Sequence, residues 1–294
     1  MRFLVTGATG FLGWRSAELL AKRGHDVISV ARPGHARRAH ADALDAVSLD
    51  AGDPAARDLI AGCAAVLHFA GVPDPGRARE DPARAVRENA GTTVNLLGGC
   101  LEHGAGLIYP STVRAGAVPP PDAYALSKWL GEQSCRRHPA PATVVRLTSV
   151  FGPGQVAWEG ATGAIAAFAA RAIEGAPIVI PGNPRRTRDF IYVDDVVSAF
   201  ESIARDGRWN ENFTLARGVA TPLLHAAELV RDVARSSSEI QTPGGTLSEG
   251  EDHSYAADPE APKLDFRTRG LEEGIASYVD WLRRHPAAKG SARA

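Results

Sequence analysis

The stretch Thr6-Gly7-Ala8-Thr9-Gly10-Phe11-Leu12-Gly13 follows directly on the apolar residues 2–5 and opens a helical pattern over residues 11–23. Glycines at this spacing permit a tight turn, and they let backbone N–H groups approach a pyrophosphate at the N-terminus of a helix. Three glycines alone are a weak signal, but their place between a strand and a helix predicts a dinucleotide-binding turn. We expect cofactor contacts from Gly7, Thr9, Gly10, Phe11, Leu12 and Gly13.

Short apolar runs alternate with longer periodic segments through the first half of the chain. The expected strands are residues 2–5, 26–30, 64–69, 106–109 and 142–147, and the expected helices are residues 11–23, 83–102 and 124–137. This alternation predicts an α/β fold with a Rossmann-type, doubly wound parallel sheet. The regularity fades after Phe151, so we expect a smaller C-terminal α/β region that binds the substrate.

The predicted domain boundaries follow from this pattern. Residues 1–150 and 188–206 are expected to form the dinucleotide-binding domain, and residues 151–187 and 207–294 the substrate-binding region. Residues 236–262 are rich in Ser, Gly, Pro, Glu and Asp and predict a long surface loop. A helical period returns at residues 271–284.

The composition of the 294 residues excludes several classes of function. The 33 basic and 34 acidic side chains nearly balance, which argues against a nucleic-acid-binding protein. No apolar run is long enough to cross a membrane, and the N-terminus lacks the pattern of a signal peptide, so we expect a cytoplasmic protein. Cys63, Cys100 and Cys135 have unrelated spacings, which predicts buried thiols and neither a disulfide nor a metal site.

The end of the second expected strand bears on the identity of the dinucleotide. NAD-binding folds usually place an acidic residue there, about 20 positions past the glycines, to bind the ribose 2′-hydroxyl. This chain has Ala31 and Arg32 at that point, with Arg37 and Arg38 close by. An arginine can bind a 2′-phosphate through its planar fork, so we favour NADP over NAD. The alternative is that Arg32 is a solvated loop residue.

Two side chains point to acid–base chemistry. Tyr124 and Lys128 are four residues apart, on one face of an expected helix. We expect the ammonium of Lys128 to lower the pKa of Tyr124, which can then exchange a proton with a substrate oxygen as hydride arrives or leaves. Ser111 and Thr112 follow an expected strand and offer a hydroxyl at the carboxyl edge of the sheet, where such sheets bind ligands.

These residues, in this order, resemble the extended short-chain dehydrogenase/reductases, the NAD-dependent epimerase/dehydratase family, over nearly the whole chain. Further matching segments are Asp50-x-x-Asp53, His68-Phe69-Ala70, Asn89-Ala90-Gly91-Thr92, Val150-Phe151-Gly152-Pro153-Gly154 and residues 188–195. The resemblance implies that Tyr124 is the acid/base and that Lys128 holds the nicotinamide ribose. It also implies that Ser111 or Thr112 polarises the substrate.

The remaining binding residues are expected around these segments. Further cofactor contacts are expected from Asp50, Ala51, Phe69, Ala70, Gly71 and Asn89, with Asp50 reading the adenine amino group. Substrate contacts are expected from Val72, Pro73, Ser149 and Arg188. Arg188 resembles an arginine that binds the phosphate of a sugar nucleotide, and an ion pair with Asp189 or Asp194 is the alternative. Members of this family are often dimers through paired helices, so we expect a homodimer.

Several positions depart from the family pattern. Sugar 4,6-dehydratases of the family carry Asp-Glu after the catalytic hydroxyl residue. This chain has Val113-Arg114 there, or Thr112-Val113 if Ser111 is the hydroxyl residue, so we do not expect dehydration. Ser149 replaces an asparagine that usually contacts a diphosphate. Residues 247–252 carry carboxylates without the usual arginine, and an acidic loop repels a dianionic nucleotide. A carbonyl substrate without a nucleotide is therefore an alternative to a sugar nucleotide.

The expected function is an NAD(P)-dependent oxidoreductase that reduces a ketone, with an NDP-deoxysugar ketone as the candidate substrate. One alternative is an epimerase that oxidises and re-reduces the same carbon of a nucleotide sugar with tightly held NAD. Another is a non-catalytic, NADP-binding redox sensor, which would need neither Tyr124 nor Lys128.

Overall fold

The computed structural model describes residues 1–34, 41, 44–247, 253–254, 264 and 266–291. The chain forms two compact units. Unit 1 comprises Met1–Leu147, Val196–Leu215 and Glu260–Phe266, and unit 2 comprises Thr148–Asp195, Ala216–Pro259 and Arg267–Ala294.

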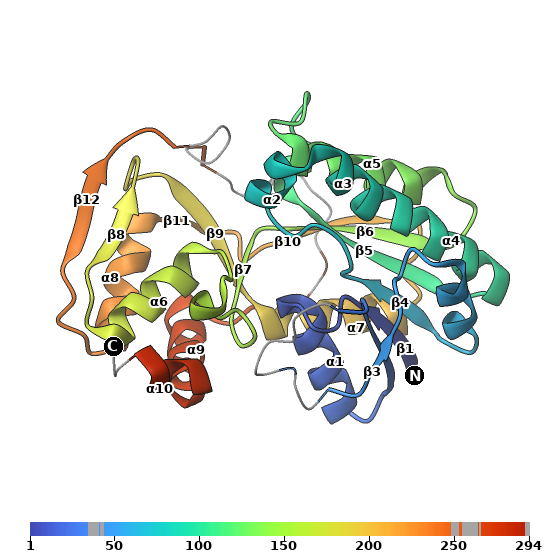
Figure 1. Cartoon of the computed structure of the whole chain (residues 1–294), viewed down its shortest axis with the longest axis horizontal. Coiled ribbons are helices and arrows are strands. Elements are labelled where there is room, and N and C mark those ends of the chain that lie inside the picture. The colour runs from blue at the N-terminus through green and yellow to red at the C-terminus, as the bar shows by residue number, and fades with distance from the viewer. Residues whose placement is uncertain (35–40, 42–43, 248–252, 255–263, 265, 292–294) are drawn as a thin grey trace. The chain divides into compact units, whose positions relative to one another are not determined.

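A seven-stranded sheet with the order β10-β6-β5-β4-β1-β2-β3 forms the centre of unit 1 (Figure 1). All neighbouring strands are parallel. The strands are β1 (Arg2–Thr6), β2 (Asp26–Ala31), β3 (Ala46–Ser48), β4 (Ala65–His68), β5 (Gly106–Thr112), β6 (Ala142–Leu147) and β10 (Asn212–Leu215). Every residue of β4 and β5 is buried, as expected for strands covered on both faces. The sheet confirms the predicted Rossmann-type, doubly wound fold.

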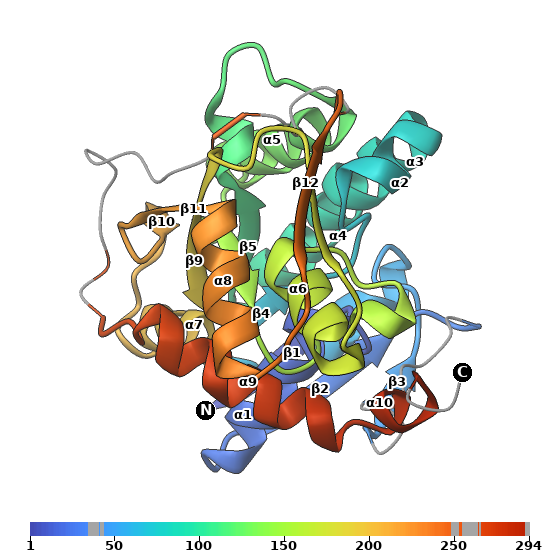
Figure 2. The ribbon, with the colours of Figure 1, turned by 90° about the vertical axis from the view of Figure 1, so that its left-hand side faces the viewer.

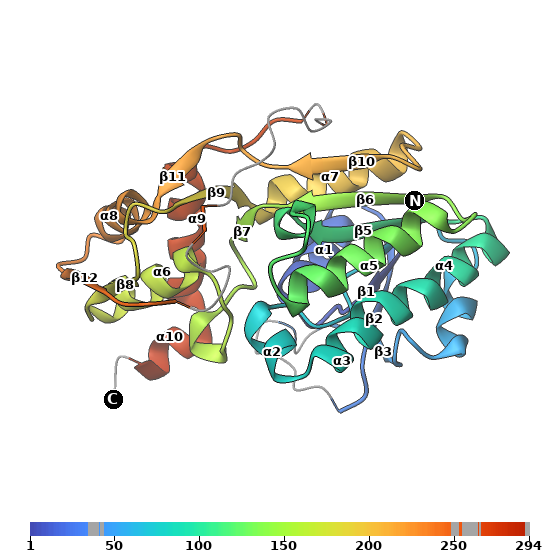
Figure 3. The ribbon, with the colours of Figure 1, turned by 90° about the horizontal axis from the view of Figure 1, so that it is seen from above.

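Helices cover both faces of this sheet (Figure 3). One face carries α1 (Phe11–Lys22) and α7 (Val193–Arg205), and the other carries α2 (Pro75–Glu80), α3 (Pro82–Val86), α4 (Thr92–His103) and α5 (Ala123–Arg137). The single helix predicted over residues 83–102 is divided, because the π-helical turn η3 (Arg87–Gly91) separates α3 from α4. Within the described part of the chain, no helix is both long and apolar enough to span a membrane.

The core of unit 1 brings α5 very close to β5. A Cβ atom added at Gly131 of α5 would lie 2.2 Å from the hydroxyl oxygen of Tyr109 and 2.9 Å from the carbonyl oxygen of Asn89. Only glycine therefore lets the α5 backbone lie this close to the Tyr109 side chain and the Asn89 carbonyl. The three cysteines lie in the same core as buried free thiols, as predicted.

The described residues of unit 2 form two small sheets and four α-helices. The strands β7 (Ser149–Phe151), β9 (Thr187–Tyr192) and β11 (Ala220–Pro222) form one sheet, and β8 (Ile178–Pro181) pairs with β12 (Ile240–Gly244). The helices are α6 (Ala164–Glu174), α8 (Leu223–Val233), α9 (Leu271–Arg284) and α10 (Pro286–Ser291). Helices α6, α8 and α9 pack against one another around the core of unit 2 (Figure 2).

Two features differ from the predicted organisation. Strand β12 lies inside the region predicted as a loop, because Ile240 and Gln241 pair with β8 despite the flanking Pro and Gly; residues 248–252 and 255–263 of that region lie outside the described residues. Strand β9 belongs to unit 2 and β10 to unit 1, whereas the predicted ranges place them the other way round. That unit 1 binds the cofactor and unit 2 the substrate stays a prediction.

We expect Gly131→Ala to lower the free energy of unfolding by about 1–3 kcal/mol, because the added methyl group forces α5 away from β5. Urea unfolding followed by circular dichroism measures this change. The matched control is Gly91→Ala, since a Cβ atom there meets no atom within 4 Å and the backbone is helical. This control is expected to be neutral or stabilising. Equal losses in both variants would contradict the role assigned to the contact of α5 with β5.

Candidate active site

The glycine turn after β1 has the shape that a bound pyrophosphate requires. Gly7 has a φ of +64°, and a Cβ atom added there would lie 2.7 Å from the carbonyl carbon of Phe69. A Cβ atom at Gly13 would lie 2.3 Å from the carbonyl oxygen of Gly7. Gly10 caps α1 without a side-chain hydrogen bond, and the first turn of α1 carries no acidic residue. The backbone N–H groups at this helix N-terminus therefore fit an anionic dinucleotide.

A buried hydrogen-bond chain fixes the backbone beside this turn. The Ala70 N–H donates to Thr6 Oγ1 (3.2 Å), and Thr6 Oγ1 lies 3.0 Å from His68 Nδ1. On the other side of the ring, His68 Nε2 lies 3.1 Å from Thr93 Oγ1, whose hydroxyl donates to the Asn89 carbonyl. The Thr93 hydroxyl therefore accepts from Nε2–H, and Nδ1 accepts from Thr6. Burial lowers the pKa of His68 to about 3, so the ring is neutral.

Asn89, a predicted cofactor residue, lies buried in the π turn. Its Oδ1 accepts from the Val72 N–H (2.9 Å), and its Nδ2 donates to the Val72 carbonyl (3.1 Å) and to Ser127 Oγ (2.9 Å). A Cβ atom at Gly71 would lie 2.1 Å from Asn89 Oδ1. The amide of Asn89 thus holds the Gly71-Val72 backbone in place, and a direct contact of Asn89 with the cofactor stays a prediction.

Tyr124 and Lys128 lie together on α5, as the spacing predicts. Asp122 caps this helix, because its Oδ1 accepts from the Ala125 N–H (2.8 Å), and Tyr124 falls in the first turn. Lys128 Nζ donates to the Pro110 carbonyl at 3.1 Å and lies 5.1 Å from the centre of the Tyr109 ring. These contacts place the ammonium against the end of β5.

The expected effect of Lys128 on Tyr124 is wrong for this structure. Burial raises the pKa of Tyr124 to about 12, and the cation that works against this rise is Arg114. Burial also lowers the pKa of Lys128 to about 8. Arg114 pairs with Asp122 at the start of α5. Tyr124 therefore keeps its proton at neutral pH, and burial is the main cause of its raised pKa.

The structure separates the two hydroxyl residues predicted to contact the substrate. Ser111 Oγ is buried and donates to Glu132 Oε1 at 2.7 Å, so its proton is directed into the fold, and its substrate role stays a prediction. Thr112 is the last residue of β5, and neighbouring strand residues point to opposite faces. Thr112 Oγ1 accepts from the Arg114 N–H at 3.3 Å, and its hydroxyl retains a proton to donate.

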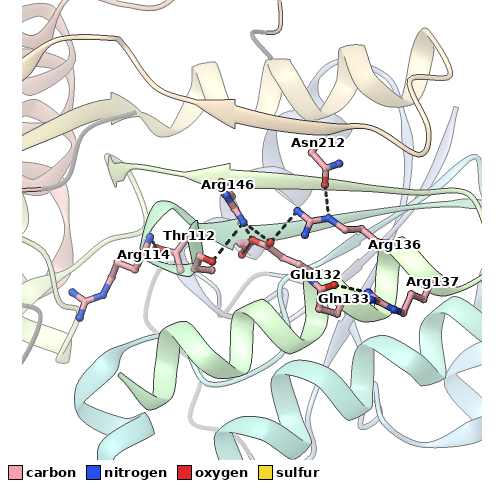
Figure 4. A network of polar contacts seen from close by, with 10 residues as sticks. Thr112, Arg114, Glu132, Gln133, Arg136, Arg137, Arg146 and Asn212 are labelled. Atoms are coloured by element: carbon pink, nitrogen blue, oxygen red, sulfur yellow. Dashed lines mark hydrogen bonds and ion pairs between the residues drawn. The ribbon is translucent and has the colours of Figure 1, made fainter. Parts of the chain in front are cut away.

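Glu132 is the centre of a charged network that the sequence analysis missed (Figure 4). Its carboxylate is fully buried and accepts two hydrogen bonds from Arg146, at 2.9 and 2.7 Å. Arg136 donates to the same carboxylate at 3.1 Å. Arg146 also donates to the Ala115 carbonyl at 3.5 Å, in the turn after β5. The missed signal is the spacing: Glu132 lies eight residues after Tyr124, on the buried side of α5, where an acidic residue requires cationic partners.

Arg32, predicted to favour NADP, and Asp50, predicted to read the adenine amino group, lie in contact. Arg32 Nε lies 3.1 Å from Asp50 Oδ2, and Arg32 Nη1 donates to Glu88 Oε1 at 2.9 Å. Glu88 was not predicted. Arg37 and Arg38 lie outside the described residues.

The predicted substrate residues are divided between the two units. Val72 is buried and Pro73 is exposed, both in unit 1. Ser149 opens β7 in unit 2, and Arg188 of β9 donates to the carbonyls of Thr187 (2.9 Å) and His253 (2.6 Å). Asp189, a suggested partner of Arg188, accepts from two backbone N–H groups of residues 217–218. The substrate roles stay predictions, and the acidic residues Glu249, Glu251, Asp252 and Asp258 lie outside the described part.

A glycine turn before α1, a doubly wound sheet and a Tyr–Lys pair on α5 together define a protein of the short-chain dehydrogenase/reductase class. The model of the NAD dependent epimerase/dehydratase family matches residues 3–216, and the chain belongs to this family. The resemblance inferred from the motifs is thereby confirmed.

Similar proteins catalyse different reactions. The chain is 27% identical to a dTDP-glucose 4,6-dehydratase of Streptomyces antibioticus, over 98% of this chain and 94% of that protein. It is 26% identical to a dTDP-4-dehydro-6-deoxy-D-allose reductase of Streptomyces bikiniensis, over 96% of each. The crystal structure of a UDP-glucose 4-epimerase from Thermotoga maritima with UDP-glucose superimposes with a TM-score of 0.82 at 25% identity, over 97% of this chain and 99% of that one.

We expect the stability difference between the wild type and Lys128→Met to grow as the pH rises from about 8 to 10.5. The pKa of Lys128 falls from 10.5 to about 8 on folding, so the unfolded chain binds more protons over this range. The contribution of Lys128 to the free energy of unfolding therefore rises with pH. Urea unfolding across the range measures it, with Lys22→Met on the exposed side of α1 as the control. A difference that is independent of pH would contradict the burial of the ammonium.

Proposed function

We propose that this protein is an NAD(P)-dependent reductase of a ketone, with Tyr124 as the proton donor. The observation that carries the proposal is the position of Tyr124 in the first turn of α5, one turn before Lys128, whose ammonium is held at the end of β5 by the Pro110 carbonyl. The phenol keeps its proton at neutral pH and can give it to a substrate oxygen. Thr112 lies at the end of the neighbouring strand and offers a second hydrogen bond to the same oxygen.

In the proposed reaction, Tyr124, Thr112 and Lys128 of unit 1 have separate roles. A bound dihydronicotinamide supplies the hydride that adds to the carbonyl carbon. Tyr124 transfers its hydroxyl proton to the oxygen, which receives the electron pair of the C=O bond, so one hydride and one proton convert the ketone into an alcohol. Thr112 donates a hydrogen bond to the oxygen as negative charge develops there. Lys128, held by the Pro110 carbonyl, would bind ribose hydroxyls of the cofactor, and Arg114 is the cation that favours the phenolate that remains.

NADP is the cofactor that we propose. The guanidinium of Arg32 would bind the 2′-phosphate, and Asp50 would read the adenine amino group. The glycine turn and the N-terminus of α1 would hold the pyrophosphate, as their geometry permits.

An NDP-deoxysugar ketone is the substrate class that we propose. The similarity to the reductase from S. bikiniensis supports it. A dehydratase is also among the relatives, but Val113 and Arg114 follow Thr112 here, and the carboxylate of Asp122 caps α5 and pairs with Arg114. Dehydration needs an acid and a base at this place, so we propose that the chain does not catalyse it.

An epimerase is the second candidate, supported by the similarity to the enzyme from T. maritima. An epimerase re-reduces its own product and needs no added cofactor. Protein purified without added nucleotide and then denatured distinguishes the two. One nicotinamide released per chain, together with interconversion of a nucleotide sugar without added cofactor, would favour the epimerase.

We expect Tyr124→Phe to lower kcat for NADPH-dependent ketone reduction by about 10²–10⁴, because it removes the transferred proton. Thr112→Val is expected to cost about 10² in kcat through the lost hydrogen bond to the oxygen. The matched control is Ser111→Ala, which removes the hydroxyl bound to Glu132 and is expected to leave kcat nearly unchanged. NADPH absorbance with a panel of 4-keto deoxysugar nucleotides and smaller ketones measures all three. Full activity of Tyr124→Phe would disprove its role, and a large loss in Ser111→Ala would restore Ser111 as the substrate hydroxyl.

A homodimer through α4 and α5 is our proposal for the assembly. Val94 and Leu101 of α4 are 48% and 50% exposed and lie seven residues apart on one side of the helix, and Leu126 of α5 is 42% exposed. We expect sedimentation equilibrium to give twice the chain mass for the wild type and a lower mass for Val94→Glu/Leu101→Glu. The control is Val47→Glu on β3, an exposed valine away from this surface. A monomeric wild type would overturn the proposal.

A further inference from the structure

Arg32 connects three segments that lie far apart in the sequence. It follows β2, Asp50 follows β3, and Glu88 lies in the π turn η3. Arg32 Nε lies 3.1 Å from Asp50 Oδ2, and Arg32 Nη1 lies 2.9 Å from Glu88 Oε1. Two carboxylates thus bind one guanidinium.

Each carboxylate has a further partner that holds it in place. Asp50 Oδ1 accepts from the Gly52 N–H at 2.8 Å, which fixes the carboxylate at the end of β3. Glu88 Oε1 also accepts from Arg84 Nε at 2.7 Å, one helical turn earlier. Burial works to raise the pKa of Glu88, but the hydrogen bonds from Arg32 and Arg84 outweigh it and lower this pKa. Glu88 is therefore an anion at neutral pH.

A 2′-phosphate and Glu88 require the same donor. A phosphate binds arginine through two or more N–H groups of the fork, and Glu88 occupies one end of that fork. The phosphate would also bring up to two negative charges beside Glu88 and Asp50, and like charges repel. The side chain of Arg32 is 35% exposed and that of Glu88 17%, so the pair is partly screened by water and can exchange partners.

We propose that Glu88 sets the cofactor preference of this protein by competing with the 2′-phosphate of NADP for the guanidinium of Arg32. The inference rests on the proposed binding of that phosphate by Arg32. Glu88 reduces the difference in affinity between NADP and NAD. The 2′-phosphate of NADP must displace the Glu88 carboxylate from Arg32, whereas the 2′-hydroxyl of NAD binds without displacing it.

Isothermal titration with 2′,5′-ADP and with ADP tests the proposal without a substrate. The measured quantity is the ratio of the dissociation constant for ADP to that for 2′,5′-ADP, which isolates the 2′-phosphate. Glu88→Gln is expected to raise this ratio about fivefold, the size of one partly exposed charge pair. Arg32→Ala is expected to lower it at least fivefold. Glu102→Gln is the matched control, since Glu102 pairs with Arg57 at 2.8 Å in an exposed contact of α4, and it is expected to leave the ratio unchanged.

The double variant Arg32→Ala/Glu88→Gln distinguishes competition from a general effect of charge. If Glu88 acts through Arg32, Glu88→Gln changes the ratio less than twofold once Arg32 is gone. If Glu88→Gln still raises the ratio fivefold when Arg32 is already alanine, the inference is wrong. It is also wrong if Glu88→Gln alone leaves the ratio unchanged while Arg32→Ala lowers it. In both cases the proposed cofactor role of Arg32 stands. An unchanged ratio in Arg32→Ala would overturn that role and the inference together. Wild-type affinity for ADP in each variant shows that the protein is folded.

Discussion

The packing of α5 against β5 determines where the reactive groups of unit 1 lie. Gly131 lets the helix backbone approach Tyr109, and the same closeness brings Lys128 within hydrogen-bond distance of the Pro110 carbonyl. Tyr124 precedes Lys128 by one turn and takes its position from the same contact. The arrangement that we propose for proton transfer is thus set by a helix and a strand, which hold side chains more firmly than a loop does.

The charged networks around Glu132 and around Arg32 differ in burial, and burial determines whether their ion pairs can be separated. Glu132 is fully buried with Arg146 and Arg136, so separating these charges would leave an uncompensated ion in the core. This network supports the end of β5 as a fixed structure. The Arg32–Glu88 pair is partly exposed, where single ion pairs contribute little to stability. It can therefore exchange one anion for another.

The sequence predicts the features of this protein that depend on local pattern. The glycine turn, the parallel strands and the Tyr124–Lys128 pair follow from periodicity and spacing, and the structure confirms the fold. Which of two adjacent hydroxyls donates to Glu132 depends on a contact across 21 residues, and the pKa of Tyr124 depends on burial. Strand β12 forms through pairing with β8, which its Gly- and Pro-rich surroundings do not indicate. These features arise from tertiary contacts, which a pattern in one segment does not contain.

The buried hydrogen bonds around His68 have one consequence for the whole protein. They run from the Ala70 N–H through Thr6, His68 and Thr93 to the Asn89 carbonyl. Histidine is the residue whose charge most often changes in mild acid. In His68 each ring nitrogen has one hydroxyl partner, so Nε2 carries the proton and Nδ1 accepts a hydrogen bond. His68 is thereby removed from the groups that can sense physiological acidity. His68 therefore stays neutral between Thr6 of β1 and Thr93 of α4, and its hydrogen bonds to them do not change with pH over the range in which an exposed histidine titrates.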